Sequence, residues 1–293
     1  YMALQFILGP SGAGKSEYIY EDIIRRTMQD ERENVIVLVP EQYSLEIQRK
    51  LVQKHPRGGS FQIDVIGFNR LAYRIFDELH IKPKKVLEDF GKSMLLRKAA
   101  QEHKEELSLY AGSLDKAGFI DEAKSLMSEI YQYDIPRERL REALQKLDDS
   151  EEARVLARKL QDMLVIFDAF EEKKGQSFIV AEQMLELLTA AAEQSELIAG
   201  SEIVLDGFTG FTPIQLNLIS VLLRRAKKVT IVLTIDAATY EKKHVAEHEL
   251  FALTKQTIEH LLLTAEQAHV VVEPALFLGK DGCKRWSKGH PLA

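Results

Sequence analysis

The chain contains a single cysteine, Cys283, among its 293 residues. One cysteine excludes an intramolecular disulfide and a metal site built from clustered cysteines. The sequence also lacks an apolar run of the roughly 20 residues that a membrane-spanning helix requires, and it contains no internal repeat or low-complexity segment. Because an apolar strand pattern begins at the N-terminus, we expect no signal peptide. Together these absences predict a cytoplasmic protein that does not bind a membrane.

An excess of positive charge is also missing. The 39 Lys and Arg residues are outnumbered by 45 Asp and Glu residues, so the formal net charge is −6. Such a chain is not a general polyanion binder. Two short basic runs, 82–85 and 224–228, are interpreted as solvated helix ends or loops, so any contact with a DNA backbone needs other support. The length suits two domains, or one domain with a large insertion.

The most informative segment reads G-P-S-G-A-G-K-S and directly follows the apolar run 3–8. The pattern G-x-x-x-x-G-K-[ST] after a strand predicts a phosphate-binding loop that leads into a helix. Backbone N–H groups and the helix N-terminus would surround phosphate oxygens. Lys15 is predicted to reach the β- and γ-phosphates, and the Ser16 hydroxyl to hold Mg²⁺. The predicted ATP-binding residues are Gly9, Pro10, Ser11, Gly12, Ala13, Gly14, Lys15 and Ser16.

Strand and helix patterns alternate on both sides of a long helical block. The predicted strands cover residues 3–8, 35–39, 61–66, 203–206, 229–233 and 269–272. The predicted helices between them cover residues 15–29, 44–54, a segment from 67 or 69 onward, 213–225 and 247–264. This alternation predicts an α/β fold with a parallel sheet, right-handed crossovers and flanking helices.

The intervening block carries helical periodicity for about 100 residues. Its predicted helices cover residues 90–105, 116–133, 136–146, 151–174 and 180–194, which indicates an all-helical insertion. We therefore expect an α/β domain from residues 2–88 and 196–275, a helical insertion over 89–195, and a loop or linker over 276–293. Since no terminal element is predicted, the chain is expected to be a fragment of a longer protein.

Asp206 ends a short apolar strand and is the candidate acid for holding Mg²⁺ on a strand neighbouring the loop. The segment from Asp206 to Gln215 resembles the D-E-x-Q-D-x-x-x-x-Q segment of superfamily 1 helicases of the UvrD type. Gly207 stands where those proteins have the glutamate that polarises the attacking water, and Gly210 where they have a second aspartate. General-base catalysis contributes a factor of about 10² to 10⁴. The segment therefore predicts ATP binding with slow or absent hydrolysis.

Nearly the whole chain resembles the AddB family, the helicase-like and nuclease subunits of bacterial AddAB (RecBCD-like) complexes. The segments that carry the resemblance are G-P-S-G-A-G-K-S at Gly9, L-V-P-E-Q-Y at Leu38, F-N-R-L-A-Y-R at Phe68, L-L-R-K at Leu95, D-K-A-G-F at Asp115, V-L-D-G-F-T-G-F-T-P-I-Q at Val204, H-E-L-F-A-L-T at His248 and P-L-A at Pro291. The stretch 278–289 matches poorly.

The resemblance implies a RecA-like, P-loop first domain with a helical insertion, from a complex that processes DNA double-strand breaks for recombination and recognises Chi. It implies an AddA-like motor and nuclease partner, and both single-stranded and double-stranded DNA as ligands. The nuclease domain and the iron–sulfur cluster of the family would lie in an absent C-terminal part. The resemblance also makes Gln215 a candidate for nucleotide sensing.

In superfamily 1 proteins, the loops after the second and third strands face single-stranded DNA. The matching loops here make Gln42, Phe68 and Arg70 candidate DNA contacts, since aromatic rings stack on bases and arginines bind phosphates. Tyr43 is a further candidate for base stacking, and Asn69 and Arg74 are further candidates for phosphate contacts. The alternative for the aromatic residues is packing in the first turn of a helix, and for Arg74 a solvated surface.

Two other functions remain open from the residues. A self-contained P-loop kinase would use the helical block as a lid, with Arg137, Arg139 and Arg141 as the arginines that clamp the transferred phosphate. A purely structural module would have lost nucleotide binding, although the intact Lys15 and Ser16 disfavour this alternative.

Overall fold

The computed structural model describes residues 2–30, 32–82, 84–116, 118–148, 150–242, 244–246 and 248–279. By its internal contacts the chain divides into two compact units. Unit 1 comprises residues 1–81, 188–211 and 215–293, and unit 2 comprises residues 82–187 with 212–214. No helix in the described ranges is long and apolar enough to cross a membrane.

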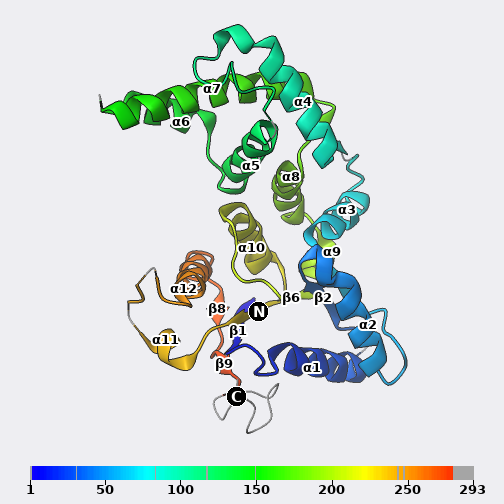
Figure 1. Cartoon of the computed structure of the whole chain (residues 1–293). Coiled ribbons are helices and arrows are strands. Elements are labelled where there is room, and N and C mark those ends of the chain that lie inside the picture. The colour runs from blue at the N-terminus through cyan, green and yellow to red at the C-terminus, as the bar shows by residue number, and fades with distance from the viewer. Residues whose placement is uncertain are drawn as a thin grey trace. The chain divides into compact units, whose positions relative to one another are not determined.

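Unit 1 contains a parallel sheet whose strands follow the order β3-β2-β6-β7-β1-β8, with β9 also paired to β1. Figure 1 labels β1, β2, β6, β8 and β9 of this sheet. The strands are β1 (Ala3–Gly9), β2 (Asn34–Leu38), β3 (Ile63–Ile66), β6 (Ser201–Leu205), β7 (Lys228–Thr234), β8 (Val271–Val272) and β9 (Leu276–Phe277). The predicted α/β fold with a parallel sheet is confirmed. The strand order places β7 between β1 and β6, which the sequence did not reveal.

Helices connect most of the strands of unit 1. They are α1 (Lys15–Gln29), α2 (Ser44–Lys54), α3 (Phe68–Glu78), α9 (Glu196–Ala199), α11 (Ala237–Glu241) and α12 (Ala252–Gln267), while α8 (Ala181–Ala192) and α10 (Pro213–Arg225) each contain residues of both units. The side chains of Ile19, Ile23 and Ile24 on α1 pack in one core cluster with Val35 and Val37 of β2. Burial on both faces explains the near-continuous apolar sequence of the central strands.

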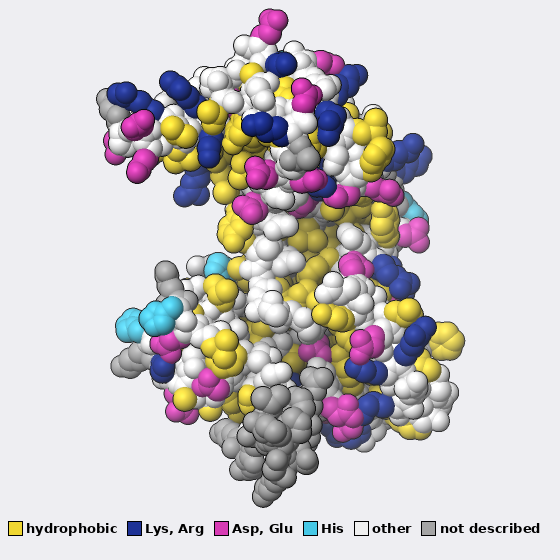
Figure 2. Space-filling model, viewed as in Figure 1, with side chains coloured by type: hydrophobic (Ala, Val, Ile, Leu, Met, Phe, Trp, Pro, Cys, Tyr) yellow, Lys and Arg dark blue, Asp and Glu magenta, His cyan; other side chains and the backbone are white. Residues whose placement is uncertain are grey.

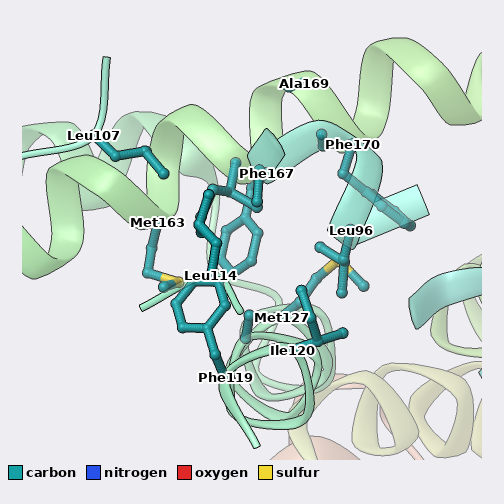
Figure 3. Close-up of a cluster of buried hydrophobic side chains, with 14 of the residues drawn as sticks. Leu96, Leu107, Leu114, Phe119, Ile120, Met127, Met163, Phe167, Ala169 and Phe170 are labelled. Carbon is teal, nitrogen blue, oxygen red and sulfur yellow. The ribbon is translucent and has the colours of Figure 1, made fainter. Parts of the chain in front are cut away.

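Unit 2 is mostly helical, with α4 (Asp89–Glu102), α5 (Phe119–Gln132), α6 (Arg137–Gln145) and α7 (Glu151–Lys174). Its core gathers side chains from α4, α5 and α7, and Figure 3 shows Leu96, Phe119, Met127 and Phe167 pointing toward one another. The block is not wholly helical, because Lys85–Val86 (β4) and Phe178–Ile179 (β5) form a two-stranded parallel sheet.

A buried carboxylate fixes the loop that follows α4 in unit 2. Asp162 on α7 is 1% exposed and accepts hydrogen bonds from the backbone N–H groups of Ser108, Leu109 and Tyr110 at 2.7–2.8 Å. The hydroxyl of Ser108 also donates to Asp162, at 3.1 Å. The aspartate therefore satisfies backbone groups that no helix or sheet satisfies.

Several boundaries differ from the prediction. The helix expected from residue 247 begins at Ala252, and the short helices α9 and α11 were not predicted, because segments of four and five residues show no helical period. Leu276–Phe277 fall in the segment expected to be loop and instead pair with β1 as β9. The loop predicted for 279–293 lies, beyond residue 279, outside the described residues, as does Cys283.

Candidate functional site

The glycine-rich loop joins the end of β1 to the start of α1. Gly12 (φ 77°) and Gly14 (φ 84°) adopt left-handed backbone conformations, which L-residues with a side chain rarely adopt. A Cβ atom on Gly9 would lie 2.3 Å from the carbonyl oxygen of Leu278, just after β9. The glycines of the motif are thus explained by backbone geometry at two positions and by close packing at a third.

Lys15 lies at the base of this loop and is 8% exposed. Its Nζ atom donates to the carbonyl oxygens of Gly9 (2.9 Å) and Pro10 (2.8 Å), so the ammonium group holds the loop in a closed curve. A phosphate that enters the loop would compete with these two carbonyls for the same donor. The charge needed for phosphate binding is in place before any ligand arrives.

A cleft of about 530 Å³ opens above the loop. It is lined by Ser11, Gly12, Gly14, Lys15, Ser16, Glu17, Asp206, Gly207, Phe208, Thr209, Val232 and Thr234. The structure therefore brings Lys15 and Ser16 together with Asp206 along one cleft. Ala13, by contrast, is only 1% exposed and is not among the residues that line the cleft.

Asp206 is held from two sides. Its Oδ2 atom accepts a hydrogen bond of 2.6 Å from the hydroxyl of Tyr20, and its Oδ1 atom accepts one of 2.8 Å from the backbone N–H of Gly207. Burial, with the negative charge of Asp206 as the next cause, raises the pKa of Tyr20 well above its usual value. The sequence did not single out Tyr20, because its place in the buried stripe of α1 is that of an ordinary core residue.

The strand that carries Asp206 is not the hydrogen-bonded neighbour of β1. We expected a neighbouring strand, but β7 pairs with both β1 and β6 and separates them. Neighbouring strands lie about 4.8 Å apart, so Asp206 and the loop end on strands separated by roughly 10 Å. That separation leaves room for a phosphate and a hydrated cation between the loop and the carboxylate.

Gly207 follows Asp206 and has an unusual backbone conformation. Its φ is 81°, in the left-handed region, and an added Cβ would lie 3.3 Å from Cδ of Pro40. The position that carries a glutamate in superfamily 1 helicases is therefore occupied here by a residue whose backbone favours glycine. Gly207 therefore differs from the helicase pattern in two ways: it lacks the glutamate side chain, and its backbone is in the left-handed region.

The candidate DNA contacts differ in exposure. Gln42, in the short turn Glu41–Tyr43, and Arg70, in the first turn of α3, are exposed. Phe68 is only 9% exposed, and its ring centroid lies 5.4 Å from that of Phe208. Phe68 is therefore a packed side chain in the first turn of α3, which is the alternative to DNA contact that the sequence left open for the aromatic residues.

The same region contains two further pairings. Glu41 Oε1 accepts from the backbone N–H of Asn69 at 3.0 Å, so Glu41 caps the N-terminus of α3. Arg74 forms an ion pair with Asp64, which reduces its availability to a phosphate.

Gln215 lies half-buried in the first turn of α10, outside the residues that line the cleft. On the face that Figure 2 shows, basic and acidic side chains are interspersed.

The arginines of the kinase alternative lie in unit 2. Arg137 and Arg141 both pair with Asp168, at 2.7 and 2.6 Å. Their charges are compensated within the helical unit, as in an ordinary helix–helix contact. This pairing disfavours a role for them as phosphate clamps.

A parallel sheet with one strand between the loop strand and the acid-bearing strand, flanked by helices, defines a RecA-like α/β protein. The comparisons with known proteins place the chain more closely. The family described as "ADDB, N-terminal" matches residues 6–293, and the chain belongs to this family.

Among the curated relatives are proteins named as the B subunits of an ATP-dependent helicase/deoxyribonuclease. The chain is 38% identical to that of Lachnoclostridium phytofermentans over 96% of its own length and 24% of the relative's. It is 32% identical to the relative from Clostridium kluyveri, over 99% of its own length and 25% of the relative's length. It is also 32% identical to the relative from Caldanaerobacter subterraneus subsp. tengcongensis, over 100% of its own length and 25% of the relative's length. The chain thus spans about a quarter of the length of these relatives.

Proposed function

We propose that the chain is the nucleotide-binding, degenerate helicase-like N-terminal region of an AddB protein. In this proposal it binds ATP with Mg²⁺ and hydrolyses it slowly or not at all. The observation that supports it most is the cleft that Lys15, Ser16 and Asp206 line together, beside a loop with two left-handed glycines. The names of the relatives, an ATP-dependent helicase/deoxyribonuclease, are consistent with this role.

The residues present suit ATP and Mg²⁺. The loop amides and the N-terminus of α1 would bind phosphate oxygens, and Lys15 would move from the carbonyls of Gly9 and Pro10 to the phosphates. Ser16 and Asp206 would hold the metal, whose charge would offset that of the β- and γ-phosphates. Glu17 also lines the cleft, but it pairs with Lys54, which reduces its repulsion of an anionic ligand.

The proposal extends to the complex. We propose that the longer protein pairs with an AddA-like motor protein and acts on double-stranded and single-stranded DNA ends during recombinational repair. The exposed Gln42 and Arg70 stay as candidate contacts to single-stranded DNA, whereas Phe68 does not, because its ring is packed against Phe208. No residue of this chain is assigned to nuclease chemistry or to an iron–sulfur cluster.

The test is ATP·Mg²⁺ binding and turnover, measured side by side on this chain with and without single-stranded DNA. We expect binding without DNA-stimulated turnover. Fast turnover would mean that another residue replaces the lost glutamate, and the degenerate interpretation would be wrong. An absence of binding would favour a structural module.

Restoring the helicase glutamate should not restore hydrolysis. Gly207→Glu places a side chain where φ is 81° and Pro40 is in contact, and a left-handed conformation costs an L-residue about 1–2 kcal/mol. We expect a lower melting temperature and no gain in ATP turnover. Gly112→Glu, at a glycine with open space around it, is the matched control and should leave stability nearly unchanged. A clear rise in turnover in Gly207→Glu would contradict this expectation.

A further inference from the structure

We propose that Tyr20 is a positioning residue for the metal at this site: its hydroxyl orients the carboxylate of Asp206 for the Mg²⁺ that accompanies ATP. The inference rests on the proposed function and deepens it. It assigns a role to a side chain that belongs neither to the loop motif nor to the strand-end acid.

The contact is direct and buried. Tyr20 lies on α1, five residues after Lys15, and is 3% exposed. Its hydroxyl reaches across to the end of β6 and donates to Asp206 Oδ2 at 2.6 Å, a length typical of a hydrogen bond to a charged oxygen. The helix that begins at the phosphate loop thereby also holds the acid on the opposite side of the cleft.

The two donors leave Asp206 ready to bind a cation. Tyr20 uses one acceptor direction on Oδ2, and the backbone N–H of Gly207 uses one on Oδ1. A carboxylate has about four acceptor directions, so each oxygen keeps one. Because Asp206 lines the cleft while both donors restrain its rotation, the remaining directions are set before the metal binds.

Packing alone does not explain a tyrosine at this position. Its neighbours in the buried stripe of α1 are the isoleucines Ile19, Ile23 and Ile24, which fill the core without a polar atom. A buried phenol hydroxyl needs a hydrogen-bond acceptor, and the acceptor for Tyr20 is the carboxylate of Asp206. Hydrogen bonds that orient metal ligands typically contribute about 10- to 100-fold in metal affinity.

The experiment measures the affinity of the 293-residue chain for ATP with saturating Mg²⁺ and with EDTA. The ratio of the two affinities reports how much the metal adds. Tyr20→Phe removes only the hydroxyl and keeps the ring in the core, so we expect this ratio to fall about 10-fold or more. ATP affinity in EDTA should change little. Tyr73→Phe, the same change at a half-exposed position on α3, should leave both affinities unchanged.

A double-mutant cycle separates positioning from general loss of structure. In an Asp206→Asn background, which already lacks the charge, Tyr20→Phe should have little further effect on the ratio. If Tyr20→Phe lowers both affinities equally, or leaves the ratio unchanged or higher, the inference is wrong while the proposed function stands. If the unmodified chain binds no ATP, both are wrong. Melting temperatures of all variants show whether each is folded.

Discussion

Lys15→Ala is expected to weaken ATP·Mg²⁺ binding at least about 100-fold. Lys15 is 8% exposed and lines the cleft, and no other lysine or arginine lines the cleft among the described residues. A hydrogen bond to a charged group contributes about 1.5–3 kcal/mol, and about 1.4 kcal/mol corresponds to a tenfold change in affinity. Two such contacts to phosphates, lost together, exceed a factor of about 100.

Isothermal titration of ATP with Mg²⁺ measures this effect. Lys50→Ala is the control, because Lys50 is an exposed lysine on α2 that pairs with Glu46 on the same helix. That variant should bind like the unmodified chain. The loop carbonyls of Gly9 and Pro10 lose their donor in Lys15→Ala, so its melting temperature should be recorded as well. An unchanged ATP affinity in a folded Lys15→Ala would remove the phosphate-binding assignment.

Asp162→Ala is expected to destabilise unit 2 clearly. It leaves the backbone N–H groups of Ser108, Leu109 and Tyr110 without their acceptor in a region where the aspartate itself is 1% exposed. An unsatisfied buried donor costs about 1–3 kcal/mol. Because Ser108 and Leu109 are exposed residues whose N–H groups can reach water, we expect a loss of about 2–3 kcal/mol in the free energy of unfolding.

Thermal and denaturant unfolding provide the measurement. Asp168→Ala is the matched control, since it removes a carboxylate from the same helix at a position 42% exposed that contacts only side chains of α6 in the described ranges. Exposed ion pairs contribute about 0–1 kcal/mol, so the control should change stability little. Equal effects of the two substitutions would show that the backbone contacts of Asp162 are not important. ATP binding by the folded fraction should be unaffected in both variants.

The fold class followed from local signals. The β-branched runs at Val35–Val39 and Val229–Leu233, each followed by an amphipathic segment, predicted a parallel sheet, and the structure confirms it. Shorter elements were missed because two to five residues carry too little periodicity, as in β9 and α11. Pairing with β1, rather than any local preference, makes a strand of Leu276–Phe277.

The candidate site was predictable only in part. The loop from Gly9 to Ser16 and the acid at Asp206 were visible because their residue types and spacing are rare by chance. Their meeting in one cleft depends on β6 and β1 ending at the same edge of the sheet with β7 between them, and no local pattern predicted this order. Phe68 illustrates the reverse case, since an aromatic residue predicted to meet DNA is packed against Phe208.

The amino-acid sequence by itself determined the chemistry that is available: a lysine and a serine at the start of a helix, an acid at the end of a strand, and glycine where helicases have glutamate. Tertiary structure alone decided which groups meet. Tyr20 and Asp206 are separated by 186 positions in the chain, and no spacing pattern relates them. The burial of Phe68 likewise arises from a contact between distant segments, since its ring packs against Phe208. A local sequence pattern reflects the conformational preferences of residues close together in the chain. Hydrogen bonds across the sheet join distant residues, and they depend on the order of the strands.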